Sequence, residues 1–471
     1  MNMKNNMNEF QERSDLFESS LNSDFKQVHG IFYTDSKLSS DMIEFLEIPN
    51  DSSIIDPCCG SGSFILNAKQ RGYNEIYGCD FDESTIKKCK ELTLCSNLYC
   101  IDTLGNTGAA ILDHIGHEKF DYVIGNPPYA PLSGDVTISS DSEFLKTVST
   151  SGNNLYVAAI YRAFELAKED GIISVIIPKS LLHVKAYAKL RKHILQNKTI
   201  LSIVELGIRF KEVRGEQIIL TLKNSKVRNN RIRFHSYSNG DFKLLAVTPQ
   251  DFYTNEVIVF VNNNEPDIYK KLINNYKTLE HYKVCTIARG KSKEEAIRGK
   301  QIRKYGFKDL ELPLSGTKVF IQNIYTAEAG ITATFAGELN AGETVTVVTT
   351  NDYDMAKYLI GILHSRICNY YLVRFAYNNS RLTMHADGKY LYTIPFVISE
   401  KHKAELIESV TMLEACEYLS PEWFSLNDKL NDIVYNIYDF TDTEKLYIET
   451  EMRTISSSKW YLDGNARTIY Y

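Results

Sequence analysis

The tetrapeptide Asn126-Pro127-Pro128-Tyr129 places an amide, two prolines and an aromatic ring directly after the apolar stretch 121–125. Proline has a locked φ and no N–H for a sheet, and the residue before a proline is driven towards extended geometry. We therefore predict a rigid tetrapeptide at the carboxyl end of a strand. Asn126 would present its amide oxygen and Pro127 its carbonyl, which suits an amino group with two hydrogens to donate. Tyr129 would offer a flat face to a ring. A plain strand-ending turn is the alternative.

A glycine loop follows an earlier strand-like stretch. Residues 53–64 read as a strand, then the loop Asp56-Pro57-Cys58-Cys59-Gly60-Ser61-Gly62, then the start of a helix. Glycines allow a tight turn and a close approach of a ligand to the backbone. The loop lacks the Gly-x-x-x-x-Gly-Lys pattern of nucleotide triphosphatases, so it does not indicate a phosphate cradle. A purely structural strand-to-helix turn is the alternative.

Two further acids end strand-like stretches. Residues 75–79 lead to Asp80, and residues 98–101 lead to Asp102. An acid at the tip of the second strand of a doubly wound sheet can accept hydrogen bonds from both hydroxyls of a ribose. We predict that role for Asp80. Asp82 is the nearby alternative, and it is more typical of a helix cap.

Strand-like and helical stretches alternate from residue 53 to residue 223, which predicts a doubly wound α/β sheet. Ligands bind such sheets at the carboxyl ends of the strands. Asp56, Asp80, Asp102 and the tetrapeptide should therefore meet at one edge. From about residue 235 the alternation ends, and short strand-like pieces mix with basic and glycine-rich turns.

The bulk composition indicates a soluble globular protein of two or three domains, with 471 residues of which 44 % are hydrophobic and 24 % charged. We expect a cytoplasmic protein, because the start is polar and no apolar run reaches the roughly 18 residues of a membrane span. The nine cysteines lack Cys-x-x-Cys spacing, so we expect no metal site. The net charge of -6 conceals two basic stretches, 179–233 and 283–308. These are either a DNA-binding face or solvated helix faces.

Asn126-Pro127-Pro128-Tyr129 resembles the catalytic motif of methyltransferases that modify exocyclic amino or amide nitrogens with S-adenosylmethionine. With Asp56-Pro57-x-x-Gly60-Ser61-Gly62 and the order of segments, the chain resembles the gamma class of DNA adenine-N6 methyltransferases, the TaqI-like group of restriction-modification systems. The resemblance is specific over the first half and loose over the second. It implies a class I methyltransferase domain, which is Rossmann-like with a mostly parallel seven-stranded sheet. The implied reaction transfers a methyl group to N6 of an adenine flipped out of double-stranded DNA.

The resemblance also implies individual roles. Asn126, Pro127, Pro128 and Tyr129 would form the catalytic motif, and Tyr129 and Phe210 would stack on opposite faces of the target base. Core packing is the alternative for Phe210. The cofactor, released as S-adenosylhomocysteine, would contact Tyr33, Thr34, Asp56, Pro57, Gly60, Ser61, Gly62, Asp80, Phe81, Asp102 and Asn126. No metal is required, because the methyl donor is already activated.

Three segments are expected: a catalytic domain over 1–234, a mixed α+β target-recognition domain over 235–400, and a helical C-terminal extension over 401–471. The candidate DNA contacts are Arg209, Lys211, Arg214, Lys291, Lys293, Arg298 and Lys300. We expect a monomer that acts on double-stranded DNA. A cognate restriction endonuclease is a second partner that the resemblance allows.

Two other functions fit parts of the sequence. Families that methylate guanine N2 in RNA or a glutamine in a protein share an Asn-Pro-Pro-Tyr-like motif, although the basic C-terminal half favours DNA. A catalytically silent DNA-binding protein with a methyltransferase-like fold is the second alternative. The intact Asn126 and the glycine loop are evidence against it.

Overall fold

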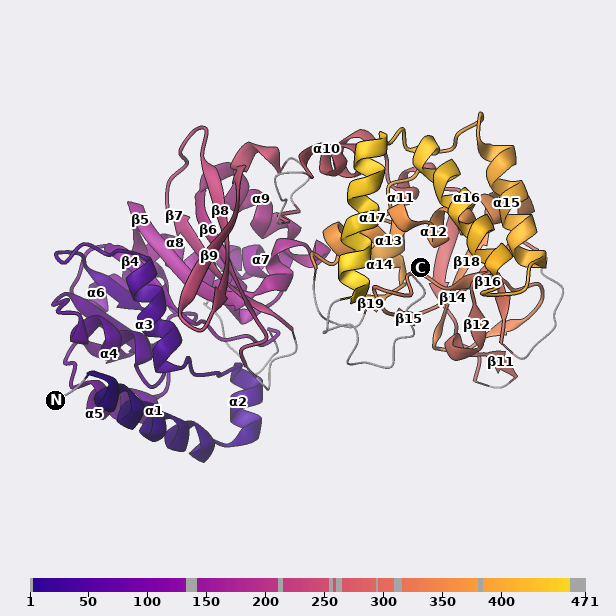
Figure 1. Cartoon of the computed structure of the whole chain (residues 1–471). Coiled ribbons are helices and arrows are strands. Elements are labelled where there is room, and N and C mark those ends of the chain that lie inside the picture. Colours follow the sequence, from indigo (N-terminus) through magenta and orange to yellow (C-terminus); the bar gives the residue numbers. More distant parts are fainter. Residues whose placement is uncertain are drawn as a thin grey trace. The chain divides into compact units, whose positions relative to one another are not determined.

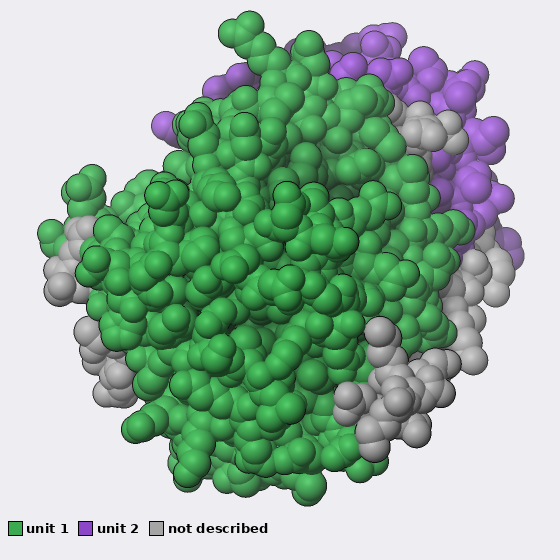
Figure 2. Space-filling model, turned by 90° about the vertical axis from the view of Figure 1, so that its left-hand side faces the viewer, with its two compact units in different colours: residues 1–260 green, residues 261–471 purple. Residues whose placement is uncertain are grey.

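The chain forms two compact units, residues 1–260 and residues 261–471, which Figure 2 distinguishes by colour. The structure is a computed structural model and describes residues 3–132, 142–210, 215–253, 257–259, 265–293, 295–308, 316–379 and 384–457. The first unit is built on one large sheet, and the second combines a smaller sheet with helices (Figure 1). In the part of the chain that the structure describes, no helix is long and apolar enough to cross a membrane.

A nine-stranded sheet organises the first unit. In spatial order its strands are β3 (Leu98–Cys100), β2 (Ile76–Asp80), β1 (Ile54–Asp56), β4 (Phe120–Gly125), β5 (Ala167–Pro178), β7 (Gln217–Lys223), β6 (Thr199–Gly207), β8 (Arg231–Ser238) and β9 (Asp241–Pro249). The strands from β3 to β5 run parallel, and β7 is antiparallel to both of its neighbours. The chain moves outward from β1 to β3 and then returns to place β4 on the other side of β1. This reversal of strand order is the point at which doubly wound sheets bind ligands.

Helices connect these strands and cover them. They are α1 (Met3–Ser20), α2 (Ser23–His29), α3 (Ser36–Phe45), α4 (Ser63–Gln70), α5 (Glu83–Thr93), α6 (Gly108–Ile115), α7 (Ser142–Thr150), α8 (Leu155–Leu166) and α9 (Ala188–Asn197). Short polar side chains start several of them. Asp35 caps α3 by accepting from the N–H of Leu38, and Asp82 caps α5 by accepting from the N–H of Thr85. The cap role predicted for Asp82 is confirmed.

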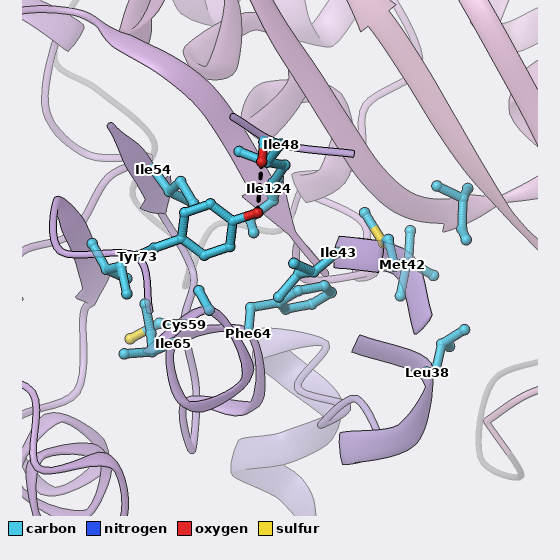
Figure 3. Close-up of a cluster of buried hydrophobic side chains, with 14 of the residues drawn as sticks. Leu38, Met42, Ile43, Ile48, Ile54, Cys59, Phe64, Ile65, Tyr73 and Ile124 are labelled. Atoms are coloured by element: carbon cyan, nitrogen blue, oxygen red, sulfur yellow. Dashed lines mark hydrogen bonds between the residues drawn. The ribbon is translucent and has the colours of Figure 1, made fainter. Parts of the chain in front are cut away.

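The core beneath the glycine loop joins helix and sheet. Figure 3 shows Met42 of α3 and Phe64 of α4 in one cluster with Ile54 and Ile124 of the sheet. Residue Ile55, which points to the other face of β1, is also fully buried. Both faces of the sheet are therefore covered at β1, as is typical of the parallel part of a doubly wound sheet.

The second unit contains the antiparallel sheet β10 (Cys285–Arg289), β18 (Val345–Thr350), β14 (Lys318–Gln322) and β16 (Ala333–Phe335). Its shorter strands are β11 (Ala296–Ile297), β12 (Ile302–Arg303), β13 (Gly306–Phe307), β15 (Ile324–Tyr325), β17 (Asn340–Ala341) and β19 (Met384–His385). Its α-helices are α10 (Pro266–Tyr269), α11 (Leu279–Tyr282), α12 (Tyr353–His364), α13 (Arg366–Tyr371), α14 (Gly388–Leu391), α15 (Lys403–Ala415), α16 (Pro421–Ile437) and α17 (Asp442–Ser457). The unit is mixed α+β, and its end is helical.

The predicted fold class is confirmed, with two differences. The seven strands implied by the resemblance are present as β1 to β7, but β8 and β9 extend the same sheet. The first unit therefore ends at residue 260 rather than at residue 234. The reason is a hairpin: Ser238 pairs with Asp241 across the two-residue turn Asn239-Gly240, and β8 pairs parallel to β6.

A substitution at Gly62, at the start of α4, would show how tightly the glycine loop is packed against α5. Gly62 has φ +93°, and an added Cβ would lie 2.5 Å from Cys89 Sγ and 2.7 Å from Thr93 Cγ2. Gly72 has nearly the same φ, +90°, but nothing within 4 Å of an added Cβ. We expect Gly72→Ala to cost about 1 kcal/mol from backbone conformation alone. Gly62→Ala should cost about 1–3 kcal/mol more through overpacking.

The measurement is urea unfolding followed by circular dichroism. Tryptophan fluorescence would miss the effect, because Trp423 and Trp460 both belong to the second unit. Equal losses for the two variants would contradict the steric account of the loop.

Candidate active site

A pocket lies at the carboxyl edge of β1, β2, β3 and β4, and we call it the strand-edge pocket. It encloses about 680 Å³, its open mouth included. Ten of the eleven residues predicted to contact a cofactor line it: Tyr33, Thr34, Asp56, Pro57, Gly60, Ser61, Asp80, Phe81, Asp102 and Asn126. Parallel strands that end at one edge bring these distant segments together.

The eleventh residue, Gly62, does not line the strand-edge pocket. Its α-carbon faces Cys89 and Thr93 of α5, so its role is to let α4 approach α5 closely. The part of the loop that faces the pocket is held by the acids. The N–H of Gly60 donates to Asp80 Oδ2 at 3.1 Å, and the N–H of Cys58 donates to Asp56 Oδ1 at 3.1 Å.

Asp56 and Asp80 are buried acids with raised pKa values. Burial raises the pKa of Asp56 to about 8, the N–H of Cys58 opposes the shift, and the carboxylate of Asp80 adds to it. Burial likewise raises the pKa of Asp80 to about 6, against the N–H groups of Asp82 and Gly60. Both acids gain from a positive charge placed between them, because it would favour their ionised forms.

Two other groups in the pocket have unused hydrogen-bonding capacity. Asp102 Oδ1 accepts from the N–H groups of Leu104 and Gly105 at 3.0 and 2.9 Å, and its other oxygen has no hydrogen-bond partner among the described residues. Thr34 is only 6 % exposed, and its hydroxyl has no partner in the same residues. A buried polar group without a partner is costly, which makes Thr34 a natural contact for a polar ligand.

The tetrapeptide is tied to the segment that follows α2. Asn126 Nδ2 donates to the carbonyl of Phe32 at 2.8 Å, and the N–H of Tyr129 donates to the carbonyl of Gly30 at 3.1 Å. Gly30 has φ +61°, and an added Cβ would lie 2.6 Å from the nitrogen of Tyr129. The amide orientation of Asn126 is thereby fixed, with its oxygen left to accept. The carbonyl of Pro127 accepts no hydrogen bond from the described residues.

Tyr129 points its hydroxyl inward. The hydroxyl contacts two acceptors, Asn126 Oδ1 and the carbonyl of Ile176, the latter at 2.8 Å. A phenol has one proton, so it donates to one acceptor at a time. Burial raises the pKa of Tyr129 well above its usual value, so the phenol remains neutral. Tyr129 and Pro127 do not line the strand-edge pocket, whereas Asn126 and Pro128 do.

A second pocket begins on the other side of the tetrapeptide, and we call it the aromatic pocket. It encloses about 1530 Å³, its open mouth included, and Phe32, Tyr129, Tyr156 and Tyr187 line it. Phe32 lines both pockets, and its ring is stacked on Tyr129 with 6.1 Å between centroids. The tetrapeptide and Phe32 together separate the two pockets.

Phe210, for which the sequence left base stacking and core packing open, lies beside this junction. Its centroid is 6.2 Å from that of Tyr129, but the two ring planes meet at 65°. It is also packed against the core cluster. A base needs a parallel slot for two stacking faces, so the ring of Phe210 would have to turn to serve as the second one.

The walls supplied by α1 and α2 were not predicted from the sequence. Ser14 of α1 is hydrogen-bonded to Ser61 of the glycine loop at 2.7 Å, and Phe17 stacks near Tyr33. His29 of α2 lies 4.9 Å from Phe81 between ring centroids. Glu18, Ser19, Leu21, Ser23, Lys26 and Gln27 line the aromatic pocket. In the sequence, the aromatic residues near the ends of these two helices were the one feature that could have indicated a pocket wall.

The candidate DNA contacts fall into separate places. Arg209, in the first unit, lies 3.9 Å from Asp35 and over the ring of Tyr237. Lys211 and Arg214 lie outside the described residues. In the second unit, Lys293, Arg298 and Lys300 line one groove together with the acids Glu295 and Glu343. Lys291 is exposed but does not line that groove.

The fold and the site define an α/β domain whose strand edge holds a glycine loop, paired acids and an Asn-Pro-Pro-Tyr tetrapeptide. The sequence profile of the N-6 DNA Methylase family matches residues 14–278, and the chain belongs to that family. The match begins within α1, so it includes residues of α1 and α2 that form pocket walls not predicted from the sequence.

Two relatives each match less than half of the chain. The type II methyltransferase M.VspI of Vibrio sp. (strain 343) is 28 % identical over 211 residues, which cover 42 % of this chain and 48 % of its own. The modification methylase CviBIII of Paramecium bursaria Chlorella virus NC1A is 29 % identical over 195 residues, with coverage of 40 % and 48 %. The chain spans about half the length of these relatives.

One structural likeness extends over both units. The type IIL restriction-modification enzyme MmeI, solved in complex with DNA, matches with a TM-score of 0.58. The match covers 95 % of this chain and 82 % of that one, at 11 % identity. At this identity the likeness concerns the fold alone.

Asp56 should give the protein without ligand a distinctive pH dependence. Its folded pKa of about 8 lies above the ordinary 3.8, so the folded state keeps a proton that the unfolded state releases. The stability it contributes is present below pH 3.8 and is lost as the pH rises through 8. The folded pKa of Asp80 is about 6, so Asp80 no longer makes the free energy of unfolding depend on pH above about pH 6. Between pH 6 and 8 the free energy of unfolding of the wild type should therefore fall by about 1 kcal/mol per pH unit relative to that of Asp56→Asn.

Urea unfolding at stepped pH measures this difference. Asp113→Asn, at an exposed site on α6, is the matched control and should follow the wild type. A constant difference between wild type and Asp56→Asn from pH 6 to 8 would show that Asp56 is ionised throughout.

Proposed function

We propose that this protein transfers a methyl group from S-adenosylmethionine to N6 of an adenine in double-stranded DNA, as a gamma-class enzyme of the restriction-modification type. One observation carries the proposal: the tetrapeptide lies between two pockets. Asn126 lines the strand-edge pocket and Tyr129 lines the aromatic pocket. A group-transfer enzyme needs a donor site and an acceptor site that meet at the reacting atoms.

The strand-edge pocket fits S-adenosylmethionine. Asp80 would accept from the ribose hydroxyls, because a carboxylate has about four acceptor positions and the backbone N–H groups of Gly60, Phe81 and Asp82 do not use them all. The oxygen of Asp102 that has no partner would accept a hydrogen bond from the amino group of the cofactor's adenine. The unpaired hydroxyl of Thr34 would contact the amino-acid end, together with Tyr33. The positive charges of this ligand would favour the ionised forms of Asp56 and Asp80.

The aromatic pocket would receive the target base. A base inside a duplex cannot reach the tetrapeptide, so it must leave the helix. Tyr129 would stack on one face of the adenine. Asn126 Oδ1 and the carbonyl of Pro127 would each accept one hydrogen of N6. The hydrogen bond from Asn126 Nδ2 to the carbonyl of Phe32 supports this, because it leaves the amide oxygen as the end of the side chain that can accept.

The chemistry needs little beyond this placement. When bound, S-adenosylmethionine supplies a methyl group on a sulfonium leaving group. The two acceptors hold N6 in position and stabilise the positive charge that grows on this nitrogen during attack. The N6 proton is lost to solvent after transfer. The phenol of Tyr129 shares Asn126 Oδ1 and can turn to the carbonyl of Ile176 when N6 occupies that oxygen.

The second unit would select the DNA sequence. Lys293, Arg298 and Lys300 are exposed and line a groove of about 1380 Å³. Phosphate contacts by a few local cations are compatible with a net charge of -6, because binding depends on where the charge lies. The basic groove favours DNA over a protein glutamine as the substrate.

Asn126→Ala should reduce methyl transfer by about 10²–10³-fold, because one oriented acceptor is removed from the transition state. Asn126→Asp keeps an acceptor but sets a carboxylate oxygen against the carbonyl of Phe32, so its activity should fall between those of Ala and Asn. The measurement is transfer of a labelled methyl group to unmethylated genomic DNA, followed by sequencing of modified bases.

The control is calorimetric binding of S-adenosylmethionine, which both variants should retain. Equal inactivity of Ala and Asp on DNA that both bind would refute the two-acceptor account. Full activity of Asn126→Ala would show that the tetrapeptide is only a turn.

Replacing Lys293, Arg298 and Lys300 together by Gln should weaken DNA binding and flatten its salt dependence. Each phosphate contact contributes about 0.9 to the slope of log K against log salt, so the slope should decrease by about 2–3. Lys401→Gln and Lys429→Gln, at exposed sites outside the groove, are the matched controls. An unchanged slope in the triple variant would mean that the groove does not contact phosphate.

A further inference from the structure

We infer that the side-chain amide of Asn154 donates a hydrogen bond from Nδ2 to a ring nitrogen of the flipped adenine and so positions the base in the aromatic pocket. The inference rests on the proposed function and adds a residue to it. Asn154 is the N-cap of α8, and it lines the aromatic pocket together with Tyr129.

Backbone pairing holds Asn154 beside the tetrapeptide. Asn154 forms an antiparallel bridge with Pro131, which follows Tyr129 by two residues. Next to this bridge, the N–H of Leu155 donates to the carbonyl of Ala130 at 2.9 Å. The start of α8 is therefore attached directly to the chain that leaves the tetrapeptide, and Asn154 belongs to the same pocket wall as Tyr129.

The helix cap determines which end of the Asn154 amide is left for a ligand. Oδ1 accepts from the N–H of Tyr156 at 3.3 Å, so the oxygen is used by the cap. Nδ2 carries the hydrogens that an amide can donate, and it has no hydrogen-bond partner among the described residues. The residue is half-buried, and its Nδ2 is not fully buried. The amide nitrogen is therefore an accessible donor on a residue of the pocket wall.

The chemistry of the base edge matches this donor. The ring nitrogens N1, N3 and N7 of adenine are acceptors, and the N6 amino group is already occupied by Asn126 and Pro127 in the proposed arrangement. A base stacked on Tyr129 turns its edge, rather than its face, towards the wall beside that ring. Asparagine amides donate to adenine N7 in the major groove of DNA, so the same pairing chemistry is available to a flipped base.

Asn154→Ser separates the donor from the cap. Serine caps a helix about as well as asparagine, but its side chain ends one atom short of Nδ2. On duplex DNA carrying the site mapped by sequencing, kcat/KM should fall about tenfold, the effect of one hydrogen bond of about 1.4 kcal/mol. The urea midpoint and the calorimetric affinity for S-adenosylmethionine should not change. Asn154→Asp, which also caps but presents an acceptor in place of the donor, should lose at least as much activity.

Asn22→Ser is the matched control. Asn22 caps α2 by accepting from the N–H groups of Asp24 and Phe25, and it does not line the aromatic pocket. This variant should keep the wild-type kcat/KM. Equal losses in the two serine variants would show that altered caps, rather than a lost donor, cause the effect, and the inference would be overturned.

Deaza analogues identify the contact. Duplexes with 1-deaza-, 3-deaza- or 7-deazaadenine at the target each replace one ring nitrogen by C–H. Wild type and Asn154→Ser should differ about tenfold on adenine and on two of the analogues, and should be equal on the third. A purely structural role for the amide, or a contact with the sugar or a phosphate, would give the same ratio on all four substrates, which would contradict the inference.

The inference and the proposed function fail in different ways. If the wild type does not methylate adenine in DNA, the proposed function is wrong and the inference falls with it. If the wild type methylates adenine and Asn154→Ser does so with the same kcat/KM, only the inference is wrong.

Discussion

One hydrogen bond joins the parts of the candidate active site: Asn126 Nδ2 donates to the carbonyl of Phe32. It links the end of β4 to the segment after α2, and the bond from the N–H of Tyr129 to the carbonyl of Gly30 repeats the link. Gly30 is required there because a side chain would meet the backbone of Tyr129. Through these contacts Phe32 reaches both pockets, and the amide oxygen of Asn126 takes a single orientation.

Burial, rather than added positive charge, shapes the electrostatics of the strand-edge pocket. Asp56 and Asp80 hold the glycine loop by accepting from its N–H groups, and the same burial weakens their acidity. The acids therefore bind the backbone of the loop in the absence of a ligand, and a ligand would be bound in addition. A cationic ligand would relieve their mutual repulsion and strengthen the loop at the same time.

The local motifs were predictable, and the long-range contacts were not. Asp56, Asp80 and Asn126 were found because each ends a strand, and parallel strands end at one edge. The walls from α1 and α2 depend on contacts such as Ser14 to Ser61, which no local pattern encodes. The predicted end of the first domain, residue 234, came from the loss of α/β alternation. That alternation is also lost when a hairpin extends a sheet, as β8 and β9 do here, and Asn239-Gly240 was the sequence signal for this hairpin.

The junction between the pockets relies on main-chain oxygens. The carbonyls of Gly30, Phe32 and Ile176 accept from the tetrapeptide, and the carbonyl of Pro127 is left open. No single-codon change can delete a carbonyl, since every amino acid brings its own. Inherited variation at Phe32 or Ile176 can therefore reshape the surrounding packing while the acceptors persist. Comparison of side-chain identities across relatives would miss these groups, and their preservation would be visible only in backbone geometry.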